Sequence, residues 1–127
     1  MSSGLHSSGN PDFKDFSIGK ITYSTSKLHN VLLTNVIADR WPEVYVNAVN
    51  PGWVPTKMGG ANATGNLQKG FETQVWLATS NDPEAQVSGR YFKHKQERPY
   101  LQAADDSGVQ NEYLSLCEKG TGVGIPD

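Results

Sequence analysis

The chain has 127 residues, 36% of them hydrophobic, and carries eleven basic against thirteen acidic side chains, for a formal net charge of −2. This length suits one domain or part of one. The near-neutral balance, without a basic run, argues against electrostatic binding to nucleic acid or an anionic membrane. The single cysteine, Cys117, cannot form an internal disulfide, and no cluster of Cys and His has metal-ligand spacing.

We therefore expect a cytoplasmic protein with no metal site. The first residues, MSSGLHSSGN, lack the apolar core that a signal peptide requires, and no later run reaches the length of a membrane span.

Residues 1–22 are rich in Ser, Gly, Asn and Asp, and predict a loop or a pair of short turns. From Tyr23 apolar residues recur at helical spacing until Pro42, which predicts a heavily buried helix over residues 23–40.

The β-branched run of residues 44–52 ends in Pro-Gly and predicts a buried strand that enters a turn. The glycine-rich segment 53–65 predicts a loop that becomes ordered around a ligand. A second helix over 67–79, a second strand over 88–94 and a last helix over 105–118 follow.

The glycine-rich tail, residues 119–127, is expected to be loose. The order of elements predicts parallel strands joined by crossover helices, in one partial α/β domain over residues 1–127. Two strands are too little sheet for a complete domain of this kind, so we interpret the chain as half of a larger fold.

The stretch YSTSK, residues 23–27, places a phenol and an amine four residues apart at the start of the first predicted helix. Residues four apart share a helix face, so Tyr23 and Lys27 can present their polar groups to one point. A free tyrosine has a pKa of about 10, too high for efficient proton transfer near neutral pH, and a nearby cation favours the phenolate. A hydroxyl from Ser2 or Ser3 could orient a substrate oxygen there. On spacing alone, two solvated residues on an amphipathic helix are the favoured explanation of the pair.

The stretch YSTSK, the apolar helix after it and a strand that ends in NPGWVPT resemble the C-terminal half of the short-chain dehydrogenase/reductase family. The family signature is Tyr-x-x-x-Lys, followed by a strand that ends in Pro-Gly-x-x-x-Thr. The opening SSGLH resembles the end of the family strand that delivers a catalytic serine, and SGRYF resembles the last core strand of retinol-dehydrogenase-like members. The resemblance covers nearly all of residues 1–118 and implies the C-terminal half of a Rossmann-type doubly wound parallel sheet.

The resemblance implies an oxidoreductase that transfers a hydride between NAD or NADP and an alcohol or carbonyl substrate. Tyr23 would be the general acid/base, and Lys27 would assist it and hydrogen-bond the nicotinamide ribose. Ser3 would polarise the substrate carbonyl. The alternatives to Ser3 are Ser2 and, more weakly, Ser7 and Ser8.

The nicotinamide would lie against the turn after the first strand, formed by Pro51, Gly52, Val54 and Thr56. Without the resemblance, these residues are an ordinary turn at a strand end. The segment 57–65 would cover the substrate. A long polar insertion between Ser3 and Tyr23 resembles that of retinol-dehydrogenase-like members and favours a bulky apolar alcohol or aldehyde.

The chain departs from the family pattern in the cofactor's phosphate site. The glycine-rich turn that seats the pyrophosphate on a helix N-terminus lies upstream in the family and has no counterpart here. The cluster GTGVG, residues 120–124, follows the last predicted helix and is not expected to replace it. We therefore expect poor cofactor affinity and no activity from the chain alone, as for a fragment, a truncated gene model or a degenerate copy. The alternative function is an inactive remnant that acts as a protein-interaction module, with homo-oligomers formed through helix 23–40.

Overall fold

The computed structural model describes residues 1–16 and 19–127. Two residues of the predicted N-terminal loop, 17 and 18, thus lie outside the described residues. The helices are η1 (Gly4–Ser8), α1 (Tyr23–Arg40), α2 (Leu67–Thr79), η2 (Gln102–Asp105) and α3 (Ser107–Thr121). The strands are β1 (Asn47–Val49), β2 (Arg90–Lys93) and β3 (Gln96–Glu97). None of the described helices combines the length and the apolar character that crossing a membrane requires.

Each α-helix begins at a polar side chain that caps it. The side chains of Thr22, Asn66 and Asp106 accept hydrogen bonds from the backbone N–H three residues further on, at 3.2, 2.8 and 3.0 Å. Such a cap stabilises a helix by roughly 1 kcal/mol. The bounds of α1 and α2 are those that the spacing predicts. α3 starts and ends later than the predicted 105–118, because Asp106 caps its start and Gly122 ends it in the left-handed conformation, at φ 72°.

The three strands form a mixed sheet in the order β1-β2-β3. β1 and β2 pair in parallel, with Asn47 opposite Arg90, and α2 lies between them in the chain as the predicted crossover. The prediction that all strands of the sheet are parallel is wrong, because β3 pairs with β2 in the antiparallel direction. The connecting turn places His94 and Lys95 at φ 51° and 62°. Two consecutive residues with positive φ are usual in a tight hairpin, but Asn-Gly is its ordinary sequence signal.

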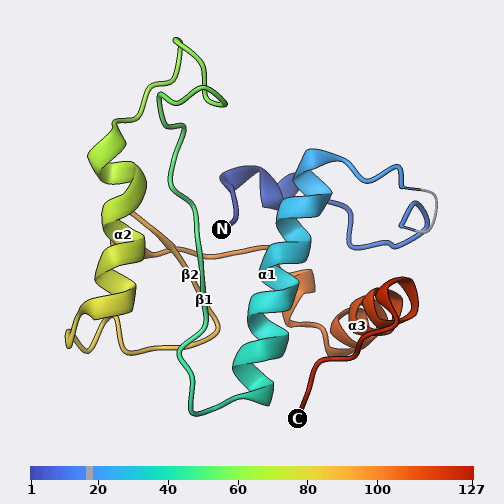
Figure 1. Ribbon diagram of the computed structural model, residues 1–127. Coiled ribbons are helices and arrows are strands. Elements are labelled where there is room, and N and C mark those ends of the chain that lie inside the picture. The colour runs from blue at the N-terminus through green and yellow to red at the C-terminus, as the bar shows by residue number, and fades with distance from the viewer. Residues whose placement is uncertain (17–18) are drawn as a thin grey trace.

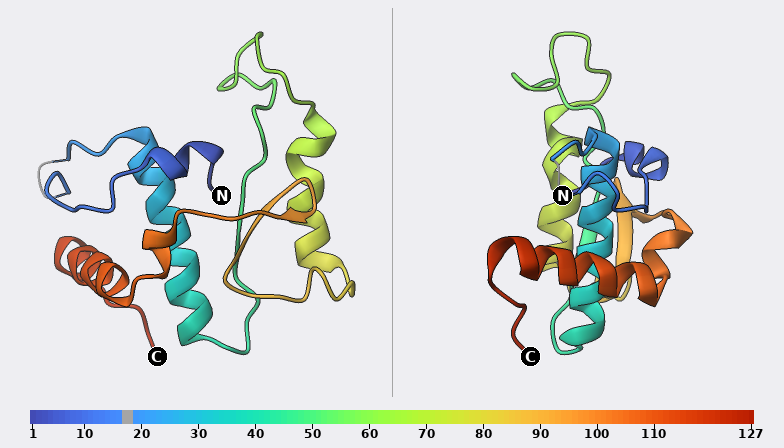
Figure 2. Two further views of the ribbon diagram at one scale, coloured as in Figure 1. Left: turned by 180° about the vertical axis from the view of Figure 1, so that it is seen from behind. Right: turned by 90° about the vertical axis from the view of Figure 1, so that its right-hand side faces the viewer.

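Helices α1 and α2 lie on opposite sides of β1 and β2 (Figure 1). α3 lies beyond α1, on the side away from α2, which the view from behind also shows (Figure 2). At the start of the chain, the backbone N–H of Ser2 donates to the carbonyl of Val49 at 2.8 Å, so the first residues run beside the end of β1. At the other end, Arg40 and Trp41 donate to the carbonyls of Ile125 and Pro126. The tail that the sequence predicts to be loose thus contacts the end of α1.

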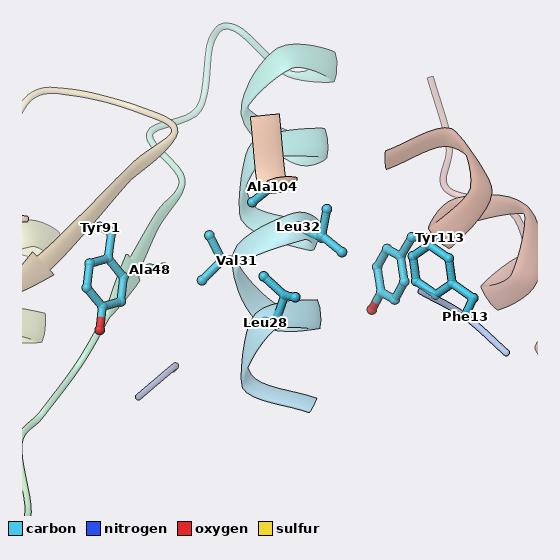
Figure 3. Packing of buried hydrophobic residues seen from close by; sticks show 8 residues of the cluster. All are labelled: Phe13, Leu28, Val31, Leu32, Ala48, Tyr91, Ala104 and Tyr113. Carbon is cyan, nitrogen blue, oxygen red and sulfur yellow. The ribbon is translucent and has the colours of Figure 1, made fainter. Parts of the chain in front are cut away.

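Helix α1 forms the centre of the hydrophobic core. Val31 and Leu32 are at most 1% exposed. Figure 3 shows Val31 pointing toward Tyr91 of the sheet, whereas Leu32 points toward Phe13 and Tyr113. Burial of a side chain of this size stabilises the fold by about 1.5–3 kcal/mol. α1 therefore joins two layers, the sheet on one side and α3 with the N-terminal loop on the other.

The degree of burial of α1 tests whether this helix has a free surface for the predicted homo-oligomer through helix 23–40. Of its 18 residues, eight are buried. The exposed ones are Tyr23, Leu33, Asp39 and Arg40. The sheet, η1, η2 and α3 all contact this helix. α1 therefore offers a second copy little apolar surface, and the burial gives no support to association through helix 23–40.

His29 lies inside an aromatic cluster between α1, α3 and the N-terminal loop. Its ring centre is 5.7 Å from that of Phe13, 5.8 Å from that of Phe16 and 5.0 Å from that of Tyr113. Its Nε2 atom is buried and has no hydrogen-bond partner among the described residues. Burial lowers the pKa of His29 below its ordinary value of 6.5, because the charged imidazolium would lose its hydration.

This histidine makes the fold sensitive to acid. As the pH falls below 6.5, the unfolded chain takes up a proton at His29 that the folded chain does not take up. The contribution of the neutral His29 side chain to the free energy of unfolding is therefore complete above this pH. It is lost as the pH falls toward the lowered pKa of His29. We expect the free energy of unfolding of His29→Phe, which keeps an aromatic ring, to fall less steeply as the pH is lowered. The difference in slope should be up to about 1.4 kcal/mol per pH unit. Urea titrations from about pH 8 to about pH 5 measure this slope, and parallel curves for the two proteins would exclude His29 as the cause.

Candidate active site

A cavity of about 550 Å³ lies beyond the carboxyl end of β1. Its walls come from the first residues of the chain, the start of α1 and the segment after β1. Six of the predicted site residues line it: Tyr23, Lys27, Pro51, Gly52, Val54 and Thr56. In α/β folds, ligands bind at this end of the parallel strands.

Tyr23 and Lys27 lie one turn apart at the start of α1. The Lys27 ammonium is 5.2 Å from the centre of the Tyr23 ring, within the range of a cation–π contact. Tyr23 is 56% exposed, so a ligand in the cavity can reach it. The Ser26 hydroxyl donates to the Tyr23 carbonyl at 2.7 Å, and Thr22 caps the same turn. Local hydrogen bonds thus fix the backbone that carries the pair.

The four candidate serines differ in how their hydroxyls are used. Ser2 lines the cavity but is buried, and its hydroxyl donates to the Lys27 carbonyl at 2.9 Å. The Ser3 oxygen accepts a hydrogen bond from the N–H of Leu5 at 3.2 Å, which leaves its own proton for a substrate oxygen. Ser7 donates to the Gly4 carbonyl, and both Ser7 and Ser8 are exposed in η1. The cavity lining therefore includes Ser2 rather than Ser3, whereas the hydrogen bonds favour Ser3 as the donor.

The turn after β1 depends on Asn50, which is not among the predicted site residues. The Asn50 side-chain oxygen accepts a hydrogen bond from the N–H of Gly52 at 2.9 Å. Gly52 has φ 81°, a conformation that residues with a Cβ rarely adopt. An asparagine that bonds the backbone two residues on is a known turn device. The stretch NPG therefore contained the signal that would have identified Asn50.

The segment after this turn folds upon itself. The Trp53 indole donates to the carbonyl of Gly59, and the N–H of Gly65 donates to the carbonyl of Trp53, both at 2.8 Å. The Thr56 hydroxyl accepts from the N–H of Gly59 at 3.1 Å. A Cβ at Gly59 would clash with the carbonyl oxygen of Val54, so this close approach requires glycine. The loop, at the top of Figure 1, thus has hydrogen bonds of its own between its two ends.

This arrangement places the chain among the α/β proteins whose ligand sites lie at the carboxyl ends of parallel strands. No family model matches the sequence. The chain is 40% identical over 120 residues to short-chain dehydrogenase chry4 of Gibberella zeae, a match that covers 93% of this chain and 44% of the relative. It is 32% identical over 146 residues to retinol dehydrogenase 14 of Mus musculus, covering 97% of this chain and 43% of the relative.

A solved structure shares the fold. The crystal structure of an uncharacterized protein from Mycobacterium paratuberculosis matches with a TM-score of 0.72 at 20% identity, covering 99% of this chain and 50% of that one. The chain belongs to the short-chain dehydrogenase/reductase family. It spans less than half the length of the two curated relatives. The family resemblance inferred from YSTSK and NPGWVPT is thereby confirmed.

Proposed function

We propose that the chain is the catalytic half of an NAD(P)-dependent oxidoreductase that acts on an alcohol or a carbonyl group. The observation that carries this proposal is the convergence of Tyr23 and Lys27 with the turn around Gly52 and Thr56 on one cavity. The names of the relatives, a short-chain dehydrogenase and a retinol dehydrogenase, support the same class of reaction. In this proposal, the chain forms the C-terminal half of a Rossmann-type parallel sheet.

The cavity fits one end of the cofactor. Lys27 offers an ammonium for the ribose hydroxyls, and Thr56 a hydroxyl for the carboxamide, while Gly52 keeps the backbone free of a side chain. Among the described residues, the glycine-rich segment that joins β1 to α2 is a long loop, not the tight turn that holds a pyrophosphate at a helix N-terminus. Bound NAD(P) would supply or accept the hydride. Its adenine and phosphate end would be held by the part of the fold that the relatives have beyond the matched region.

Side chains of this chain transfer the proton and polarise the substrate oxygen. In the direction of reduction, the Tyr23 hydroxyl gives its proton to the substrate oxygen, and in oxidation it takes that proton back. The Lys27 ammonium, on the same face of α1, stabilises the negative charge that develops on the phenol oxygen. The Ser3 hydroxyl donates to the same substrate oxygen and polarises it. Trp53, Val54 and Met58 make the cavity partly apolar, in keeping with a bulky apolar alcohol or aldehyde as substrate.

The surface of α2 supports a role as half of a larger fold. Leu67, Phe71 and Val75 lie four residues apart and are each more than half exposed. Side chains at this spacing form one stripe along the helix, and an apolar stripe is normally covered by further polypeptide. The alternative, an interaction module that uses an exposed helix 23–40, is not favoured, because α1 is buried.

Titration with NADH and NADPH, followed by cofactor fluorescence, tests this proposal. We expect the 127-residue chain to bind either cofactor with a Kd above about 1 mM. A chimera that joins the chain to the unmatched part of short-chain dehydrogenase chry4 should bind one of them at least roughly tenfold more tightly. A folded chimera that binds neither cofactor would refute the proposal, and circular dichroism of both proteins provides the control for folding.

A further inference from the structure

A second cavity, of about 780 Å³, also borders the turn that follows β1. Gly52 lines the Tyr23 cavity, Asn50 lines the second one, and the two share no lining residue. The walls of the second cavity come from η1, the ends of β1 and β2, and the segment that precedes η2. Its volume lies within the range of small-molecule sites.

The charged side chains that line this cavity are all basic. Lys93 and Arg98 are the two cationic side chains, and no aspartate or glutamate is among the lining residues. Within residues 1–16 and 19–127, neither cation forms an ion pair. Arg98 uses one N–H for the side chain of Gln96, at 2.8 Å, so other donors of its guanidinium remain available.

Two carboxylates close in the sequence have partners other than the two cations. Glu97 pairs with Arg90 at 3.3 Å, and Asp105 accepts a hydrogen bond from the Tyr100 hydroxyl at 2.6 Å. Among the described residues, neither carboxylate is within ion-pair distance of Lys93 or Arg98. A cavity with two cations and no anion is suited to a negatively charged ligand.

Tyr91 gives independent evidence for a ligand. Its side chain lines the cavity and is only 3% exposed, and its hydroxyl has no hydrogen-bond partner among the described residues. Such an unpaired buried group is unfavourable until an acceptor meets it. Burial raises the pKa of Tyr91, and the amide of Asn50 offsets part of this effect without reaching hydrogen-bond geometry. The phenol therefore stays protonated and can donate.

Two further contacts define the wall around Tyr91. The Asn50 oxygen is already bonded to the N–H of Gly52, which leaves its NH₂ group as a donor. The N–H of Leu101 donates to Nε2 of His6 at 3.2 Å, so the ring donates from Nδ1 to the Ser3 carbonyl at 2.8 Å. The His6 ring packs 4.7 Å from that of Tyr91. His6 thus holds the wall and offers no acceptor to the cavity.

We propose that this second cavity binds a small organic anion, a carboxylate or a phosphate monoester carried on a compact apolar group. Lys93 and Arg98 would bind the anionic oxygens, and Tyr91 and Asn50 would donate hydrogen bonds to them. Pro99 and Leu101 would contact the apolar group. This inference is independent of the proposed oxidoreductase activity, because it uses none of the residues of the Tyr23 cavity.

NMR titrations of the full 127-residue chain with benzoate, phenyl phosphate and the neutral benzamide test this proposal. We expect benzoate or phenyl phosphate, but not benzamide, to shift the amide signals of residues 91–102 in a saturable way. Comparison of the two anions shows whether the site prefers a carboxylate or a phosphate. The double variant Lys93→Gln/Arg98→Gln should raise the Kd by at least about tenfold, and Tyr91→Phe by about fivefold.

Lys69→Gln is the matched control, because Lys69 is an exposed lysine on α2 that lines neither cavity. This variant should bind as the unchanged chain does. The proposal is overturned if neither anion binds, if benzamide binds equally well, or if the double variant keeps the original Kd. Lys93 and Arg98 are not core residues, so the double variant tests the proposal even if Tyr91→Phe fails to fold.

Discussion

Replacement of Tyr23 by phenylalanine is expected to lower turnover by roughly 10²- to 10⁴-fold in the chimera with the unmatched part of short-chain dehydrogenase chry4. The variant keeps the aromatic ring and its contact with the Lys27 ammonium, but it loses the proton that the mechanism transfers. Cofactor binding should stay within about twofold, because the hydroxyl acts on the substrate oxygen. Steady-state kinetics and cofactor fluorescence on the same preparation measure both quantities.

Tyr45→Phe is the control for this experiment. Tyr45 is 59% exposed and lines neither of the two cavities, so the loss of its hydroxyl should leave turnover unchanged. If Tyr23→Phe retains the turnover of the parent chimera, Tyr23 is not the general acid/base. Equal losses in the two variants would point to a general effect of removing a tyrosine hydroxyl.

Replacement of Lys27 by methionine is expected to impair both binding and turnover. Methionine keeps an unbranched side chain of similar size to the lysine stem but removes the ammonium that would bind the ribose and support the Tyr23 phenolate. We expect the cofactor Kd to rise by at least about tenfold and turnover to fall by about 10²-fold in the same chimera. The joint loss distinguishes this variant from Tyr23→Phe.

Lys69→Met removes a lysine from the exposed surface of α2 and should change neither quantity. An unaltered cofactor affinity in Lys27→Met would refute the ribose contact. Unaltered turnover with weaker binding would remove Lys27 from the proton-transfer step but keep it in the cofactor site. The two outcomes separate the two proposed roles of this lysine.

The sequence predicted most reliably the features that neighbouring residues determine. The bounds of α1 follow from Thr22 at its start and from apolar spacing that stops before Pro42. The tyrosine and lysine share a face because α1 has a fixed number of residues per turn. The mixed sheet was missed because His94 and Lys95 form the β2–β3 turn without the usual glycine or asparagine.

The sequence by itself determined the three α-helices, the parallel pair of strands and the family, since caps, periodicity and the two linked motifs act over short stretches of chain. Only the tertiary structure decided how the serine hydroxyls are used and where the second cavity lies. The bond from Ser2 to the Lys27 carbonyl joins residues 25 apart, and that from Leu101 to His6 joins residues 95 apart. Contacts of this range depend on the packing of the whole chain around α1, and no local pattern of residues specifies them.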